Sequence, residues 1–479
     1  MARHPCSLRP GITAFAAMAI AAATAVRANN AFPDEFSIHF PASSPHTVFM
    51  GANFGLLVSQ DDGLTWRYAC EPWVVAGSNA ALAFANVSLY DVTADGALIA
   101  AVYQISRVTR SADVACTWPD SAGSIAGQPV SDFFPDPNDA SLVLAVVQAS
   151  KNGLPDGNHI VASHDGGSTF DAPHLYDTPN PTDLLTGIEI ARSKPGVFYA
   201  TLESTSGGQA QFLASTDFGS TWTTSPLPID TATEPRILAV DPEDEKKVYL
   251  RVISSALTDG ILFTGDGGWT FTKILSIDGL FSSFLRAGDG AIYAGTRAGK
   301  LYVRKAGATN PTDFTVQDAP HLRCMGQRRG TARIYACADM VVDGYSLASS
   351  DDNGVTFKPV MSFKDLLGPL TCAPVQTNCQ AHWQRIQGVL GIGAGADAGQ
   401  GGGGQTPGSD GSRCGSVGAG ESAILLLLAF SLQRVRFRRT SDRRGALSTN
   451  LLPDDAASLD ILSQHLAASH AAPEERRLW

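Results

Sequence analysis

The 479-residue sequence predicts an all-β protein, a seven-bladed β-propeller, on three observations. A short turn pattern, [S/T]-x-D-x-G-x-T-[W/F], recurs along the chain at almost constant spacing. A run of β-branched and other apolar residues precedes each copy of the pattern, and Gly, Asp and Pro turns separate these runs. Internal repeats of about 40 to 55 residues with this composition indicate units of four short strands. Such units close into a ring, because closure leaves only short, protected sheet edges.

The turn pattern sets the length of the repeat. The first five aspartates of the pattern are separated by 52, 52, 52 and 49 residues, and the last interval of 86 equals two repeats of 43. One copy, "SADVACTW", has Ala115 where the others have glycine. The six aspartates are Asp61, Asp113, Asp165, Asp217, Asp266 and Asp352.

The apolar runs reveal a seventh repeat, which lacks the turn pattern. The sixth run leads into "GKLYVRKAGATNPTDFTV", which keeps the strand pattern but has lost the serine and the aspartate. We therefore predict seven blades within residues 29–365. The seven runs lie near Val48, Leu98, Leu142, Val197, Val248, Ile292 and Ile334.

The chemistry of the repeated turn predicts a structural role. An aspartate in a tight turn accepts hydrogen bonds from backbone N–H groups, and a hydroxyl two positions earlier can do the same. The glycine suits a left-handed backbone, and the aromatic residue buries against neighbouring strands. The turn lacks the alternating oxygen ligands and distal glutamate of an EF-hand-like calcium loop. The chain also has no Rossmann, P-loop, HExxH or CxxC motif. We therefore expect no catalytic residues, no metal ligands and no cofactor.

These turns resemble the BNR/Asp-box repeat of sialidases, the sortilin ectodomain, xyloglucan hydrolases and a photosystem II assembly factor. The resemblance covers roughly residues 32–365 and implies the propeller fold, but the family includes both enzymes and binding scaffolds. A sialidase-like site would take an arginine from before the first Asp box, and residues 29–58 contain no Arg or Lys. Sialidases also have six blades. Xyloglucan hydrolases of this family pair two seven-bladed domains across a cleft, whereas this chain has one.

The net charge of the propeller limits the classes of molecule that it can bind. Residues 29–365 contain 22 Lys and Arg against 37 Asp and Glu, a net charge of −15. Nucleic acid and anionic membrane surfaces are therefore disfavoured as partners of the propeller. We expect a monomeric, non-catalytic scaffold that binds an extracellular glycan or protein ligand. The alternative is a glycoside hydrolase or lyase acting on extracellular polysaccharide, because paired carboxylates far apart in sequence cannot be recognised without the fold.

Residues 1–28 have the features of a signal peptide. Arg3 and Arg9 precede the apolar run Ile12 to Val26, which ends in small residues and predicts cleavage after Ala25 or Ala28. We therefore expect the protein to be exported.

Export favours disulfides over free thiols. Seven of the eight cysteines remain after the signal peptide, and six of them pair by position. The expected pairs are Cys324 with Cys337 across a hairpin, Cys372 with Cys379 around a six-residue loop in the extension 366–390, and Cys70 with Cys116 between neighbouring blades.

The C-terminal region predicts a sorting segment. A Gly-rich linker, 391–421, contains Cys414, and the segment 422–440 joins a short apolar run to an arginine cluster. This order resembles the myxobacterial sorting segment MYXO-CTERM, although Glu421 adjoins the apolar run and residues 441–479 follow the arginines. As a helix, the apolar run would span only about 16 Å of a ~30 Å hydrocarbon core.

This resemblance implies processing at Cys414 and a propeller outside the cell, at the cell surface, in the outer membrane or released. Only this C-terminal segment would contact a membrane. The tail 441–479 could form one amphipathic helix or remain disordered.

Overall fold

A computed structural model describes residues 35–75, 89–102, 106–149, 156–205, 207–230, 233–253 and 258–392. These residues belong to one compact unit of the chain. The predicted signal peptide, Cys414, the linker beyond residue 392, the segment 422–440 and the tail 441–479 lie outside the described residues. No helix within the described ranges is long and apolar enough to cross a membrane.

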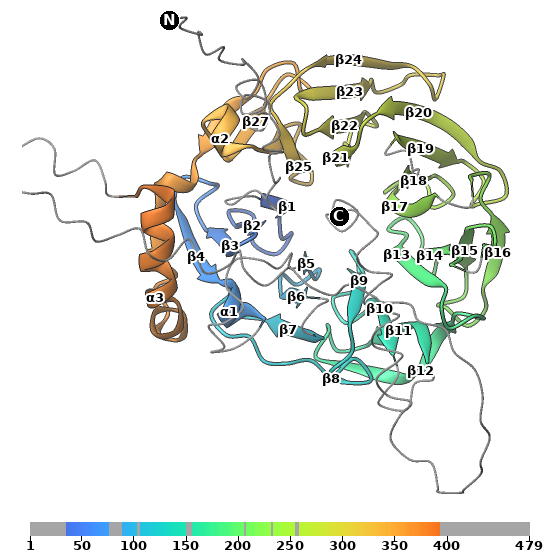
Figure 1. The fold of residues 1–479 in the computed structure, drawn as a ribbon, viewed down its shortest axis with the longest axis horizontal. Helices are drawn as coiled ribbons and strands as arrows, with labels where there is room; N and C mark the ends of the chain where they lie inside the picture. Colours follow the sequence, from blue (N-terminus) through green and yellow to red (C-terminus); the bar gives the residue numbers. More distant parts are fainter. Residues whose placement is uncertain are drawn as a thin grey trace, which may run out of the picture. The chain divides into compact units, whose positions relative to one another are not determined.

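Seven sheets follow one another around a ring and confirm the predicted seven-bladed β-propeller (Figure 1). Within each blade the strands pair antiparallel in chain order, with the first strand innermost. Blade 1 contains β1 (Glu35–His39), β2 (Val48–Ala52), β3 (Gly55–Ser59) and β4 (Trp66–Cys70); blade 2 contains β5 (Leu89–Val92), β6 (Leu98–Val102) and β7 (Arg107–Ser111); blade 3 contains β9 (Val130–Pro135), β10 (Val143–Ala149), β11 (Gly157–Ser163) and β12 (Thr169–Asp177); blade 4 contains β13 (Leu184–Ile190), β14 (Phe198–Glu203), β15 (Gln211–Ser215) and β16 (Thr223–Pro226).

The remaining blades repeat this arrangement. Blade 5 contains β17 (Glu234–Val240), β18 (Val248–Ile253), β19 (Thr258–Thr264) and β20 (Thr272–Asp278); blade 6 contains β21 (Phe281–Arg286), β22 (Ile292–Thr296), β23 (Lys300–Arg304) and β24 (Phe314–Asp318); blade 7 contains β25 (Leu322–Gln327), β26 (Ile334–Ala338), β27 (Leu347–Ser350) and β28 (Lys358–Met361). Four short elements, β8 (Ala122–Gly123), α1 (Glu71–Val74), α2 (Met340–Asp343) and the 3-10 helix η3 (Phe363–Asp365), connect or flank the blades.

The apolar runs of the sequence are the second strands of the blades. Every residue of β2, β18, β22 and β26 is buried. A strand in the middle of a blade packs against the next blade on each face, so it reads as a continuous apolar run rather than an alternating one. One hydrophobic cluster, for example, joins Leu144 and Ile160 of blade 3 to Leu185 and Phe198 of blade 4.

Blade 2 departs from the expected four strands. After β7 the chain makes only an isolated bridge, Thr109 to Asp120, where the other blades have their fourth strand. Pro119 lies in this segment and has no N–H to donate to the ladder, which limits the pairing. The chain then crosses to blade 3, where β8 pairs in parallel with the outer strand β12.

The residues after blade 7 close the ring. Strand β29 (Leu366–Pro369) pairs in parallel with β4, so the C-terminal part of the ring adds a fifth strand to blade 1. The helix α3 (Ala373–Leu390) follows and packs beside β4 at the outer edge of the ring (Figure 1). Its buried residues recur every three or four positions, as expected for one helix face. They are Val375, Cys379, His382, Trp383, Ile386 and Leu390.

Two of the three predicted disulfide pairings are wrong. Cys324 and Cys337 form a disulfide as predicted. Cys70 instead pairs with Cys379, and Cys116 with Cys372, so the predicted pairs Cys70 with Cys116 and Cys372 with Cys379 do not form. The reason is α3: two cysteines seven residues apart along a helix are separated by about 10 Å, which is too far for a disulfide.

We predict that the closing disulfide stabilises the ring more than the hairpin disulfide does. Cys70 and Cys379 are 309 residues apart, whereas Cys324 and Cys337 are 13 residues apart. Because Cys116–Cys372 stays closed when Cys70–Cys379 is removed, the extra loop that Cys70–Cys379 closes in the unfolded chain spans only about 50 residues. Loop-closure entropy then gives about 4 kcal/mol for this disulfide and about 3 kcal/mol for the hairpin disulfide. Urea denaturation of the double variants Cys70→Ala/Cys379→Ala and Cys324→Ala/Cys337→Ala measures both. A larger loss for the hairpin pair would contradict the expectation.

Candidate functional site

In each of the six repeated turns, the side chains form hydrogen bonds within the turn itself. Each turn connects the third and fourth strands of its blade, apart from the truncated blade 2. In the first turn the Ser59 hydroxyl donates to Asp61 Oδ1 at 2.8 Å and accepts from the N–H of Gly63 at 2.8 Å. Asp61 also accepts from the backbone N–H of Thr65 at 2.9 Å and from its hydroxyl at 2.6 Å. The same four hydrogen bonds recur in the turns of Asp113, Asp165, Asp217, Asp266 and Asp352.

The backbone geometry of the turn explains why glycine is usual at its fifth position. Two consecutive residues have positive φ, 61° at Asp62 and 87° at Gly63 in the first turn. In the second turn Val114 and Ala115 take the same conformation, at 57° and 66°, so alanine is tolerated where glycine is usual. For an L-residue other than glycine, this left-handed conformation costs roughly 1–2 kcal/mol.

These hydrogen bonds favour the ionised carboxylates. The Thr356 hydroxyl, with its backbone N–H and the Ser350 hydroxyl, lowers the pKa of Asp352 to about 2. The corresponding bonds from Thr65 and Thr221 lower the pKa of Asp61 and of Asp217. The turn itself thus accounts for the aspartates that the sequence singled out.

A pocket of about 620 Å³ opens at the end of the ring that carries these turns. Because the strands are antiparallel, first-to-second turns and third-to-fourth turns lie at the same end of each blade. The pocket is lined from blades 4 to 7 by residues of both kinds of turn. Its polar lining includes Arg192, Glu243, Arg286, Asp289, Gln327, Arg329, Thr331 and Asn353.

The three arginines of the pocket differ in their partners. Arg286 donates to Asp241 Oδ2 at 2.9 Å, and both side chains are buried. For Arg192 and Arg329 the described residues provide no side-chain hydrogen bond and no ion pair within 4 Å. Burial and the nearby positive charge of Arg329 lower the pKa of Arg192, and the negative charge of Glu243 opposes this shift in part. Two like charges, one from blade 4 and one from blade 7, therefore share this pocket and would be stabilised by an anion.

Carboxylates on the innermost strands join adjacent blades. Asp132 of β9 accepts from the N–H of Ile188 at 2.9 Å, and Glu189 of β13 accepts from the N–H of Val240 at 2.9 Å. An innermost strand is a sheet edge with free N–H groups, and these carboxylates satisfy two of them. Burial raises the pKa of Asp132 to about 6 and that of Glu189 to about 8.

Among the described residues, one group of His, Cys, Asp and Glu side chains could hold a metal ion. It comprises His159, His174 and Asp177 of blade 3. The sequence predicted no metal ligands, and it predicted neither this cluster nor the arginine pocket. Arg192 and Arg329 are 137 positions apart in the numbering, so no local pattern connects them. The signal available in the sequence was that His159 lies shortly before the turn of Asp165, and that His174 and Asp177 lie shortly after it.

No protein family profile and no curated protein matches the sequence. Among solved structures, the chain is similar to a puromycin-hydrolyzing peptidase from Mycobacterium tuberculosis, with 13% identity, a TM-score of 0.46 and coverage of 69% of this chain and 54% of that one. It is also similar to the Cps50 (Swd1) β-propeller domain of Myceliophteria thermophila, with 10% identity, a TM-score of 0.44 and coverage of 64% and 94%. An ancestral GH74 enzyme gives 14% identity, a TM-score of 0.39 and coverage of 68% and 48%. The fold assignment depends on the seven sheets themselves.

The turn geometry predicts different costs for alanine at two glycines. At Gly63 an added Cβ would lie 3.5 Å from its nearest neighbour, so Gly63→Ala should cost only the left-handed strain, about 1–2 kcal/mol. At Gly268 the Cβ would lie 2.4 Å from the ring of Phe212, so Gly268→Ala adds overpacking of about 1–3 kcal/mol. Chemical denaturation of both variants measures the difference, and equal losses would show that the steric argument is wrong.

Acid should weaken the turns. A carboxylate whose pKa is lowered by folding stabilises the protein above its unfolded pKa of about 4, and this contribution is lost as the pH falls through the folded value. For Asp352 that interval runs from about pH 4 down to about 2. The variant Asp352→Asn should melt lower than wild type at pH 7 and lose less of its melting temperature between pH 4 and pH 2.

Asp278→Asn serves as the control, because Asp278 is exposed and has no side-chain hydrogen bond within the described part of the chain. Its melting temperature should follow wild type across the same pH range. If Asp352→Asn also follows wild type, the turn carboxylate contributes nothing to acid sensitivity.

Proposed function

We propose that the chain is an exported, non-catalytic β-propeller that binds a carboxylate-bearing glycan in the arginine pocket. The observation that carries this proposal is the pair Arg192 and Arg329, which share a pocket of about 620 Å³ without anionic hydrogen-bond partners among the described residues. Guanidinium groups bind carboxylates through paired N–H donors, which gives direction as well as charge.

The other pocket residues favour a sugar over a simple anion. Gln327, Thr331, Asn353 and Asp289 offer neutral and charged groups that can exchange hydrogen bonds with hydroxyls. A uronic acid combines hydroxyls with one carboxylate and so matches both parts of the lining. The pocket lies between rigid blades, on turns where a scaffold can present binding residues.

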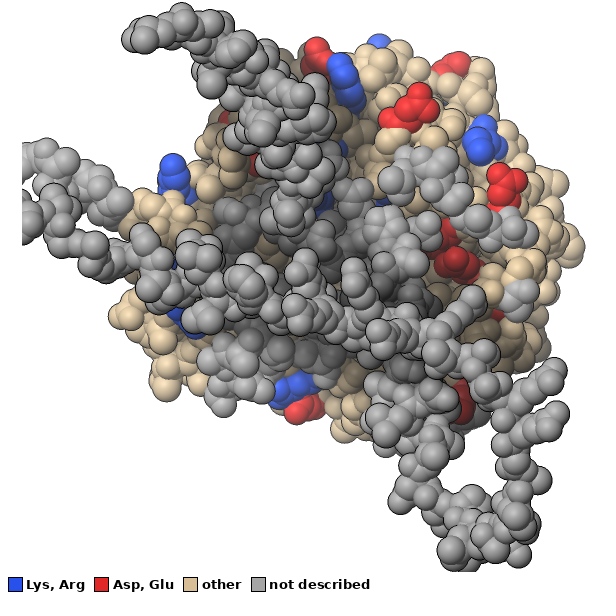
Figure 2. Space-filling view, viewed as in Figure 1, with Lys and Arg blue, Asp and Glu red and all other residues tan. Residues whose placement is uncertain are grey.

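The charge of the propeller limits the kind of polyanion. Binding to nucleic acid needs Lys and Arg against several successive phosphates. Acidic and basic side chains are interspersed on the part of the face that the described residues leave in view in Figure 2, without a continuous basic stripe there. One arginine pair suits an isolated carboxylate better than a row of phosphates.

The proposed location follows from the ends of the sequence and the disulfides. Three disulfides among the described residues favour an oxidising compartment. Together with the resemblance of residues 1–28 to a signal peptide, they support export. The BNR/Asp-box relationship and a MYXO-CTERM-like segment with processing at Cys414 remain parts of this proposal.

A hydrolase or lyase acting on extracellular polysaccharide is the second candidate. The observation that favours it is the raised pKa of Asp132 and of Glu189 on adjacent innermost strands. A carboxyl group with such a pKa can act as a general acid. Against this role, each carboxylate already accepts an N–H from the next blade.

The test is calorimetry of the full-length chain with polygalacturonate, with a neutral glucan and with an acidic peptide. We expect saturable binding to polygalacturonate, and at least a tenfold weaker affinity for Arg192→Ala and for Arg329→Ala, because each loses a charge-assisted contact worth roughly 1.5–3 kcal/mol. The matched control is Arg333→Ala, which removes an arginine paired with Asp351 outside the pocket lining and should bind like wild type.

Polygalacturonate binding that survives both pocket substitutions would refute the pocket as the site. Binding of the acidic peptide alone would indicate a protein ligand instead. Reducing ends released in a parallel hydrolysis assay would favour the enzyme.

A further inference from the structure

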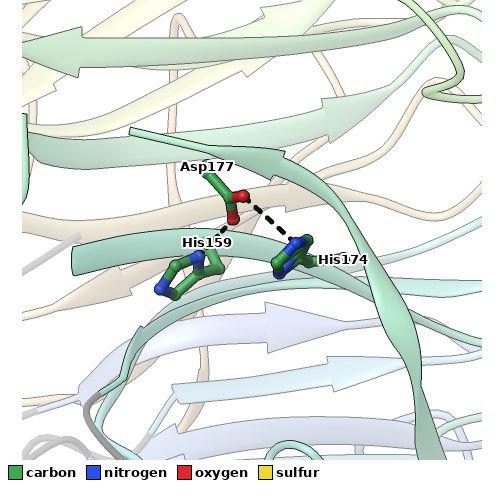
Figure 3. A group of neighbouring side chains, drawn as sticks. All are labelled: His159, His174 and Asp177. Carbon is green, nitrogen blue, oxygen red and sulfur yellow. Dashed lines mark hydrogen bonds and ion pairs between the residues drawn. The ribbon is translucent and has the colours of Figure 1, made fainter. Parts of the chain in front are cut away.

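Two histidines and one aspartate converge in blade 3 (Figure 3). His159 lies on β11, and Asp177 is its directly opposed partner on β12. The register of this pair shifts, so that Ile160 opposes Tyr176 but Ala162 opposes Asp171. The extra residues of β12 include His174. Bulges of this kind redirect a side chain, and here the bulged strand carries His174 to the same carboxylate as His159.

The three side chains are close enough to share one ion. His159 Nδ1 lies 2.5 Å from Asp177 Oδ1, and His174 Nε2 lies 3.1 Å from Asp177 Oδ2. The two imidazole rings stack at 12°, with centroids 5.4 Å apart. One potential ligand atom from each residue lies within 4.8 Å of the other two. Ligand atoms around a tetrahedral metal ion with ~2.0 Å bonds are about 3.3 Å apart, so the three atoms would move inward around an ion. Because the nitrogen lone pairs lie in the ring planes and the two rings are nearly parallel, the partly exposed ring of His174 would also turn toward the ion.

The surroundings suit an ion that approaches from solvent. The side chain of His159 is 1% exposed, whereas those of His174 and Asp177 are 26% and 43% exposed. The buried residue therefore fixes the site, while the two partly exposed residues can adjust around an ion. Within the described chain Asp177 makes no ion pair with Lys or Arg, so its charge is not balanced by a permanent cation. The Nδ1 atom of His174 is also buried and has no hydrogen-bond partner there.

A purely structural role, in which a His–Asp hydrogen bond joins the two strands of a hairpin, would explain one histidine but not two. Elsewhere in the ring, His46 contacts Asp62 at 2.5 Å and His321 contacts Asp343 at 2.9 Å, each as a single His–Asp pair. Among the His–Asp pairs of the described residues, only Asp177 contacts two imidazoles. Two imidazole nitrogens and one carboxylate oxygen form a ligand set that zinc and similar ions accept.

We propose that His159, His174 and Asp177 bind one divalent transition-metal ion of the Zn²⁺ type. Imidazole binds a metal ion through an unprotonated nitrogen, so affinity should fall as the pH is lowered. Three protein ligands leave a fourth position for water or for an oxygen of a bound ligand. This site is independent of the arginine pocket, and its test does not depend on the proposed glycan.

The experiment uses the full-length chain without an affinity tag, freed of metal with a chelator and dialysed. Zn²⁺ titration by calorimetry and Co²⁺ titration by visible absorption then report stoichiometry, affinity and ligand geometry. We expect wild type to bind at least one equivalent, and His174→Gln and Asp177→Asn each to bind one equivalent fewer or at least tenfold more weakly. Both positions are partly exposed, and circular dichroism verifies that the variants are folded.

The matched control is His46→Gln, which removes one histidine from a single His–Asp pair and should bind like wild type. If wild type binds no Zn²⁺, the proposal is refuted. It is also refuted if His174→Gln and Asp177→Asn keep the wild-type stoichiometry and affinity. An equal loss in His46→Gln would place the ion elsewhere.

Discussion

The ring has to close, because both faces of every blade are apolar and only another blade can cover them. Blades 1 and 7 meet through the innermost strands β1 and β25, and Phe40 packs on Tyr335 with ring centroids 5.0 Å apart. Strand β29 then joins blade 1 from outside, and α3 is tied to blade 1 and to the segment after β7 by two disulfides. The last described residues of the chain therefore hold the first blades in place.

The two candidate sites differ in how far they depend on the packing of neighbouring blades. The arginine pocket takes residues from blades 4 to 7, so its shape requires neighbouring blades at fixed angles. Links such as the buried ion pair of Arg251 and Asp259, whose carboxylate also accepts the N–H of Phe281 in the next blade, help to set these angles. The His159 cluster is built within one hairpin of blade 3, and so needs only that hairpin and its bulge.

The sequence was sufficient for the features that depend on neighbours in the chain. The aspartate, hydroxyl and threonine of each repeated turn bond within seven residues, and the second strands are apolar because both their faces are covered. Two of the three disulfides were mispaired because the helical spacing of Val375, Cys379, Trp383 and Ile386 was not recognised, although the sequence contains it. The arginine pair was not predictable, since Arg192 and Arg329 meet only after the ring has closed.

The two sites lie at opposite ends of the blades. The pocket shares its end with the repeated turns, whereas His159 stands near the start of β11 and the turn of Asp165 follows the end of the same strand. The arginine pair therefore lies at one end of the blades, and the two imidazoles around Asp177 lie at the other. A ligand carboxylate at the first end and a cation at the second do not compete for the same side chains. The propeller can thus present two chemically different surfaces on one rigid frame.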